Sequence, residues 1–95
     1  MTTFIMMGRY SAEAIRQISG KRTTKAVGIV ERCGGKIVAV YATLGEYDLL
    51  AITEFPGVSE AMKASVALNK ALEISFCTVP AVPVEAFDKL VGGKA

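Results

Sequence analysis

The sequence of 95 residues contains no histidine and no tryptophan. Without histidine it lacks the commonest metal ligand and the side chain that most often serves as a general base near neutral pH. A haem held by histidine is excluded, and a metal site would need carboxylates alone. There is also no Ser-His or Cys-His pair and no glycine-rich phosphate loop. We therefore expect no cofactor and no metal.

Long apolar runs and an excess of one charge are also missing. No apolar run approaches the roughly 20 residues that a membrane span needs. The net charge of +2 is too small to indicate nucleic acid or membrane binding. The segment from Met1 to Tyr10 lacks a basic region and has only a short apolar run, which predicts a strand rather than a signal peptide.

Cysteine is scarce, since Cys33 and Cys77 are the only two and lie far apart in no metal-binding spacing. Free cysteine is usually buried and inert. We expect Cys33 at the end of a helix, Cys77 in an apolar strand, and no disulfide between them. Two reduced thiols indicate a reducing, cytoplasmic setting.

What the chain has in abundance is apolar residues, at 52% of the sequence. A chain of this length forms one domain, 1–95, and buries only roughly 60–68% of its unfolded surface. So large an apolar fraction in so small a domain favours self-association.

The residue pattern predicts the element order β-α-β-β-α-β followed by a tail helix. Ser11 and Ser59 are suited to cap helices, and Ser19-Gly20 interrupts the first helical region. This order is the ferredoxin-like split βαβ arrangement, an α+β fold with both main helices on one face of a four-stranded antiparallel sheet. The expected strands are 2–10, 37–44, 47–55 and 72–79, and the expected helices are 22–33, 60–71 and 84–91.

The stretch from Lys36 to Pro56 predicts a β-hairpin with Gly45-Glu46 at its tip. Glycine at the first central position suits a two-residue type II′ turn, which would place Leu44 opposite Tyr47. Opposite residues share a face. One face, expected under the helices, then carries Val38, Val40, Ala42, Leu49 and Ala51, with Leu44 and Tyr47 near the tip. The other carries Ile37, Ala39, Tyr41, Thr43, Asp48, Leu50, Ile52 and Glu54.

The second of these faces mixes large apolar groups with two carboxylates. Full exposure to water disfavours the apolar groups, and coverage by helices disfavours the carboxylates. A face that meets another subunit or lines a cleft suits both. The sequence therefore predicts a homodimer, or a higher homo-oligomer, that pairs these open faces.

Three segments resemble the GYD-domain family: Cys33–Lys36, Tyr41–Asp48 and Glu54–Pro56. Gly45, Tyr47 and Asp48 match the residues that name the family, and Arg22 falls where such domains carry an arginine. The resemblance implies a dimeric α/β barrel, in which two ferredoxin-like subunits pack their open sheet faces together. It implies no established general activity.

The candidate site residues fall into two groups. Tyr47, Asp48 and Glu54, with Glu46, form the first, in which Asp48 or Glu54 beside an apolar wall is a candidate base. The alternative is structural: Tyr47 packs at the hairpin tip, and Asp48 accepts hydrogen bonds from backbone amides or an arginine.

The second group is a basic run of Arg9, Arg16, Lys21, Arg22 and Lys25. Lys21 and Arg22, at the start of a helix, are candidates for anion binding. The alternatives are a solvated face, or Arg22 bridging to Asp48 or Glu54. Tyr10 and Tyr41 are candidates to line a cleft, or else belong to the core or an interface.

Three functions remain open from the sequence. The first is a homo-oligomeric binding or structural module without catalysis, with a small hydrophobic or anionic molecule as its possible ligand. The second is a cofactor-independent enzyme, oxygenase- or isomerase-like, acting on a small hydrophobic molecule, which rests on fold analogy. The third is a regulatory binding protein that uses the basic run. A barrel without a cavity favours the first, and a cavity of several hundred Å³ edged by Arg22, Tyr47 or Asp48 favours the second, since ligand sites span roughly 300–1,000 Å³.

Overall fold

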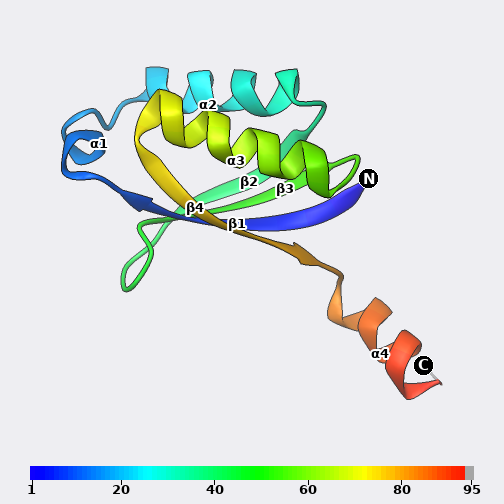
Figure 1. Ribbon diagram of the computed structural model, residues 1–95. Helices are drawn as coiled ribbons and strands as arrows, with labels where there is room; N and C mark the ends of the chain where they lie inside the picture. Colours follow the sequence, from blue (N-terminus) through cyan, green and yellow to red (C-terminus); the bar gives the residue numbers. More distant parts are fainter. Residues whose placement is uncertain (94–95) are drawn as a thin grey trace.

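The computed structural model describes residues 1–93 and has two layers, with α2 and α3 on one face of a four-stranded sheet (Figure 1). The strands are antiparallel in the order β2-β3-β1-β4, which confirms the predicted fold. The elements in chain order are β1 (Thr2–Tyr10), α1 (Ala12–Arg16), α2 (Gly20–Arg32), β2 (Lys36–Ala42), β3 (Leu49–Phe55), α3 (Val58–Leu72), β4 (Ile74–Ala81) and α4 (Val84–Gly92).

The core lies between the sheet and the two long helices. The rings of Phe4 and Phe55 meet edge to face there, with their centroids 5.9 Å apart. Thr53 is buried among apolar side chains, and its hydroxyl donates to the Phe4 carbonyl at 2.9 Å. At Gly35 the chain passes so close that an added Cβ would lie 2.4 Å from the Phe55 ring. Glycine at position 35 therefore lets β2 enter the sheet beside a fully buried aromatic ring.

Several element ends differ from those predicted. The hydroxyl of Ser19 accepts from the Arg22 amide, so α2 begins at Gly20 rather than near Arg22. The predicted Ser59 cap is wrong, because Gly57 precedes the first turn of α3 and accepts the Ala61 amide at its carbonyl.

The boundary between α3 and β4 also moves. Glu73 takes the left-handed conformation at φ 55° and ends α3, so β4 begins at Ile74 rather than Leu72. β4 then continues through Pro80, a residue tolerated here because the strand lies at the edge of the sheet.

A β-bulge at Val38 corrects the predicted hairpin register. From Ala39 opposite Ile52 to Ala42 opposite Leu49 the pairing is as predicted, but Ile37 pairs with Thr53. The extra residue turns Ile37 toward the helices and leaves Val38 52% exposed, so the predicted faces of these two residues are wrong.

The other residues expected under the helices are covered to different degrees. Ala51 is buried as predicted and Leu49 is partly buried, whereas Val40 and Ala42 are exposed, so the predicted cover of these two residues is wrong. Val40 still lines a cavity that is described below.

The hairpin tip is a six-residue loop, 43–48, rather than a two-residue turn. The Thr43 amide donates to the Asp48 carbonyl, and the Asp48 amide donates to the Gly8 carbonyl of β1 at 2.9 Å. Gly45 has a φ of 102°, the positive value expected of it. Leu44 is fully exposed at the tip, so its predicted place on the helix-covered face is wrong.

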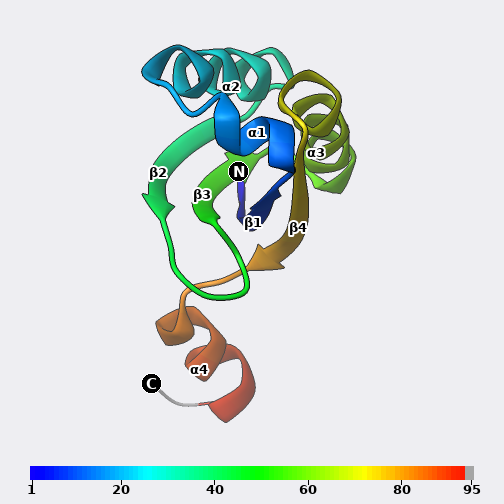
Figure 2. The same cartoon turned by 90° about the vertical axis from the view of Figure 1, so that its left-hand side faces the viewer.

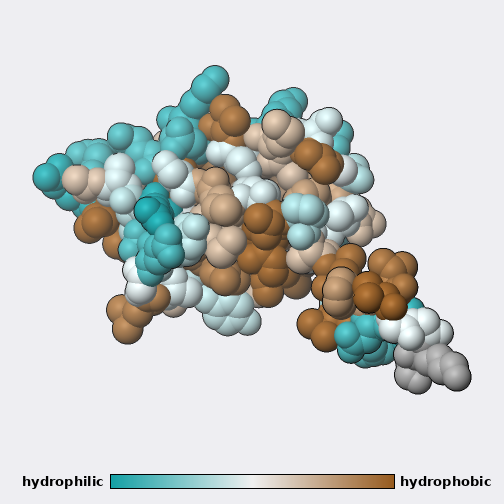
Figure 3. All heavy atoms as spheres, turned by 60° about the horizontal axis from the view of Figure 1, so that its bottom comes forward, coloured by the Kyte–Doolittle hydropathy of each residue, from teal (hydrophilic) through white to brown (hydrophobic). Residues whose placement is uncertain are grey.

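The sheet face opposite the helices, called the open face below, carries two apolar rows. Tyr41, Leu50, Met7 and Cys77 pair in line across the four strands, and so do Ala39, Ile52, Ile5 and Val79. Apolar side chains gather in the middle of this face in Figure 3. Within residues 1–93, α2 and α3 both lie on the other side of the sheet (Figure 2).

The last element, α4, extends away from the domain, and none of its residues is buried (Figure 1). Among the described residues, no helix has the length and apolar character needed to cross a membrane.

Candidate functional site

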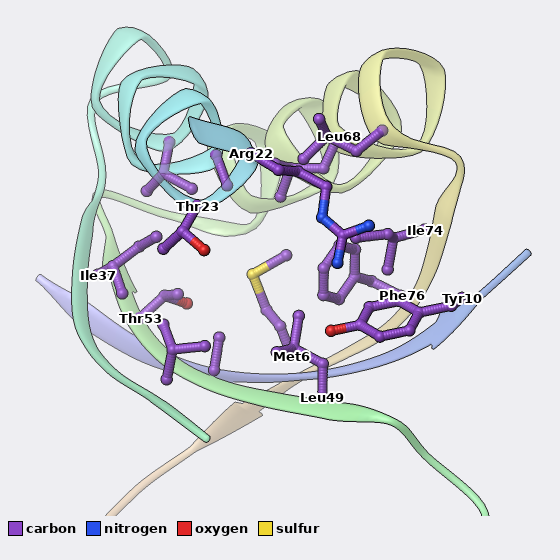
Figure 4. A pocket seen from close by; sticks show the side chains of 15 residues that line it. Met6, Tyr10, Arg22, Thr23, Ile37, Leu49, Thr53, Leu68, Ile74 and Phe76 are labelled. Carbon is purple, nitrogen blue, oxygen red and sulfur yellow. The ribbon is translucent and has the colours of Figure 1, made fainter. Parts of the chain in front are cut away.

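A cavity of about 70 Å³ lies between the sheet and the N-terminal half of α2, and we call it the helix–sheet cavity. All four strands contribute to its walls, together with α2 and α3 (Figure 4). The lining is mostly apolar. It consists of Met6, Tyr10, Arg22, Thr23, Ala26, Val30, Ile37, Val40, Leu49, Ala51, Thr53, Leu68, Leu72, Ile74 and Phe76.

Arg22 carries the one charged side chain in this lining. Its guanidinium points into the cavity in Figure 4, and its central carbon lies 4.8 Å from the centre of the Tyr10 ring. One of its N–H groups donates to the carbonyl of Ala14 in α1, and this bond anchors the side chain near the end of β1. The ion pairs within residues 1–93 are Arg9–Glu46 and Arg16–Glu13, so Arg22 has no carboxylate partner there.

The helical repeat explains why an arginine reaches this cavity. Arg22, Ala26 and Val30 are spaced four residues apart and therefore lie on one face of α2, the face that packs toward the sheet. The Ser19 cap fixes the first turn of α2, where Arg22 sits. Tyr10, a predicted candidate to line a cleft, does line this cavity, whereas Thr23 and Phe76 were not predicted from the sequence. The signal that could have pointed to a cavity here is an arginine that continues the apolar stripe of a helix.

The loop at the hairpin tip is held to the end of β1 by a hydrogen bond, an ion pair and a stacking contact. The Asp48 carboxylate accepts a hydrogen bond from the Tyr10 amide at 2.9 Å. Arg9 stacks over the Tyr47 ring at 5.0 Å and pairs with Glu46. Asp48 thus holds the end of β1, where the side chains of Arg9 and Tyr10 point to opposite faces of the sheet. This agrees with the structural alternative for Tyr47 and Asp48.

The predicted candidates do not form one site. Tyr47 and Asp48 lie together at the hairpin tip, whereas Arg22 enters the helix–sheet cavity. Glu54 lies at the other end of β3, opposite Lys36 and Thr3. Tyr41 is exposed on the open face. Arg22 bridges to neither carboxylate within the described residues.

Within residues 1–93, no three His, Cys, Asp or Glu residues gather closely enough to hold a metal ion.

The fold and the hairpin motif together define the class of protein. The element order and sheet are those of an α+β domain with ferredoxin-like topology, and Gly45, Tyr47 and Asp48 shape its hairpin loop. The GYD domain matches the sequence over residues 4–91, and the chain belongs to the GYD domain family. No curated protein matches the chain. Membership of the family assigns the fold and the motif, and it specifies no activity.

Proposed function

We propose that the chain is a homodimeric binding protein that takes a small, largely apolar anion into the helix–sheet cavity. The observation that carries this proposal is the guanidinium of Arg22, which is directed into an apolar cavity without a carboxylate partner among residues 1–93. Arg22 is partly buried, and the hydrogen bond to the Ala14 carbonyl and the contact with Tyr10 supply no opposite charge, so a partner of negative charge would stabilise it further. A ligand carboxylate supplies the missing partner, and its two oxygens match the fork of a guanidinium.

The size of the cavity limits the ligand. Its volume of about 70 Å³ exceeds the roughly 10–15 Å³ that a water molecule needs. It is well below the roughly 300–1,000 Å³ typical of sites for drug-sized ligands. A short aliphatic carboxylate therefore fits better than a large aromatic substrate. The hydroxyls of Tyr10 and Thr23 point toward the same space in Figure 4, where they add hydrogen-bond partners.

Binding is favoured over catalysis by the residues around the cavity. None of its described lining residues is an aspartate or a glutamate. Asp48, the leading candidate for a base, already accepts the Tyr10 amide outside the cavity. The volume also falls short of the several hundred Å³ that favour an enzyme acting on a hydrophobic molecule.

The proposed dimer pairs two open faces around a two-fold axis. The apolar rows of Leu50 with Met7 and of Ile52 with Ile5 supply a self-complementary surface. Pairing removes these rows from water, at about 25 cal/mol per Å² before the costs of association. Both cysteines are free thiols, and Cys77 is exposed on the open face in the row with Met7 and Leu50. An exposed free thiol on this face supports a reducing, cytoplasmic location for the protein.

The binding proposal is tested with straight-chain carboxylates from propanoate to octanoate, each compared with the alcohol of equal length. Amide chemical shifts should move around the cavity, and the best carboxylate should bind about 10–100-fold more tightly than its alcohol, as expected of hydrogen bonds to a charged group worth about 1.5–3 kcal/mol. Arg22→Gln should remove this preference. The neighbouring Lys21→Gln, on an exposed position, is the matched control and should retain it. Equal affinity for acid and alcohol, or an unaltered preference in Arg22→Gln, contradicts the proposal.

A further inference from the structure

The C-terminal segment from Val82 to Gly92, called the arm, has an apolar stripe without a partner. Phe87 is 50% exposed and Leu90 is 82% exposed, and Val84 and Val91 lie on the same side of α4. A helix of nine residues is only marginally stable in water by itself. A stable α4 therefore requires an apolar surface against which this stripe packs.

Such a surface exists on the same molecule. A groove of about 450 Å³, called the α3–β4 groove, runs between α3 and the edge strand β4. Its rim on α3 consists of Val58, Met62 and Val66, all exposed, and Phe76 and Pro80 of β4 form the other wall.

The arm does not reach the groove of its own chain. Pro83 has an extended backbone at φ −58° and ψ 142°, and a residue before proline is itself held extended. The two-residue linker Val82-Pro83 therefore continues outward from β4 instead of turning back. Figures 1 and 2 both show α4 beyond the sheet on the side away from α2 and α3, whereas the groove is built on α3.

The arm and the groove match in length and in charge. The nine residues of α4 and the nine residues of α3 from Val58 to Val66 each span about 14 Å, at about 1.5 Å per residue. The polar side of α4 carries Glu85, Asp88 and Lys89, a net charge of −1, and α3 carries Glu60, Lys63 and Lys70, a net charge of +1. Opposite charges at the rim of an interface favour the correct pairing.

We infer that the arm of one chain packs into the α3–β4 groove of a second copy. By two-fold symmetry, the arm of the second copy packs into the groove of the first. The second copy is the occupant favoured here because the chain itself supplies one complementary helix for every groove. Each groove is incomplete without the partner's α4. The inference does not depend on the helix–sheet cavity or on its ligand.

Hydrogen exchange of the α4 amides tests whether the arm packs into the groove of a second copy. Docking should slow their exchange at least about tenfold relative to a peptide with the sequence of residues 82–95, because a docking free energy of about 1.4 kcal/mol gives that factor. Met62→Lys in the groove and Leu90→Glu in the arm should each abolish the protection. Both positions are exposed in the single chain, so both variants should fold.

Co-expression of these two variants distinguishes docking of the arm on a second copy from docking on its own chain. In the mixed dimer an unaltered arm meets an unaltered groove, and the introduced glutamate meets the introduced lysine, so protection should return on both arms. Their α4 peptides differ in mass and are measured separately. Glu31→Lys on the exposed side of α2 and Leu90→Met are the matched controls, and both should retain protection. An arm that exchanges as fast as the free peptide, or a mixture in which protection does not return, overturns the inference.

Discussion

The two faces of the sheet are built from the same four strands, but they are completed in different ways. On the helix-covered face, Phe4 and Phe55 are fully enclosed by side chains of their own chain. On the open face, Ile5 and Ile52 alternate with them along the same strands and stay partly exposed. The comparison teaches that the covered face determines how one chain folds, and that the open face supplies the surface for assembly.

The largest effect is expected from the covered face. Phe55→Ala removes a ring that is fully buried and leaves a space beside Gly35, so the free energy of unfolding should fall by about 3–5 kcal/mol. Urea denaturation measures this loss. It should not depend on protein concentration, since Phe55 packs within one chain. A loss that disappears at high concentration would place Phe55 in an interface and contradict the distinction between the faces.

The matching change on the open face is Leu50→Asp. Here the proposed effect is on assembly, because a carboxylate would replace an apolar side chain at the centre of the paired faces. An interface position of this kind is worth about 2 kcal/mol or more, or roughly 30-fold in affinity. Light scattering after size exclusion should give at least twice the chain mass of 10.1 kDa for the unaltered protein and a lower mass for the variant. An unaltered chain that is a stable monomer rules out the pairing of open faces.

A smaller effect is expected at Asp48, where the two faces meet at the end of β1. Asp48→Ala leaves the Tyr10 amide without its acceptor, which should lower the free energy of unfolding by about 1–3 kcal/mol. Asp48→Asn keeps an oxygen acceptor and should recover most of the loss. Equal losses in the two variants would show that the charge of Asp48, rather than its hydrogen bond, stabilises the loop.

The smallest effects come from a matched pair at the bulge. Ile37→Ala, which faces the core, should cost about 1–2 kcal/mol, below the range for complete burial. Val38→Ala, on the exposed residue next to it, should change the free energy of unfolding by less than about 0.5 kcal/mol. Chemical denaturation of both variants tests the register. In a regular hairpin without a bulge, Val38→Ala would lower the free energy of unfolding more than Ile37→Ala.

The element order and most of the pairing between β2 and β3 could be predicted from the sequence, because the alternation of apolar and polar residues and the turn residues are local signals. Ala51 beneath the helices and Leu50 on the open face follow directly from the period of two. The bulge at Val38 was not predictable in the same way. It allows Ile37 to fill a space whose shape depends on elements distant in the chain.

The candidate site was harder to predict than the fold. The motif residues Tyr47 and Asp48 were located correctly on the hairpin, but their partners Arg9 and Tyr10 are on a strand almost forty residues earlier. Arg22 was recognised as a candidate anion ligand through its place at a helix start. Its position on the apolar face of α2 follows from the helical repeat, but the walls of the cavity that it enters come from all four strands and α3, and no local pattern encodes how these elements meet.

The pairing of Thr3 with Ala81 brings the two ends of the domain to one corner. An affinity tag or fusion partner attached before Met1 would emerge beside the root of the arm and next to Phe4 and Pro80 in the α3–β4 groove. The loop around Leu44, which is fully exposed and far along the chain from that corner, is the better place for a label or a tether. Immobilisation through that loop leaves both chain ends unencumbered.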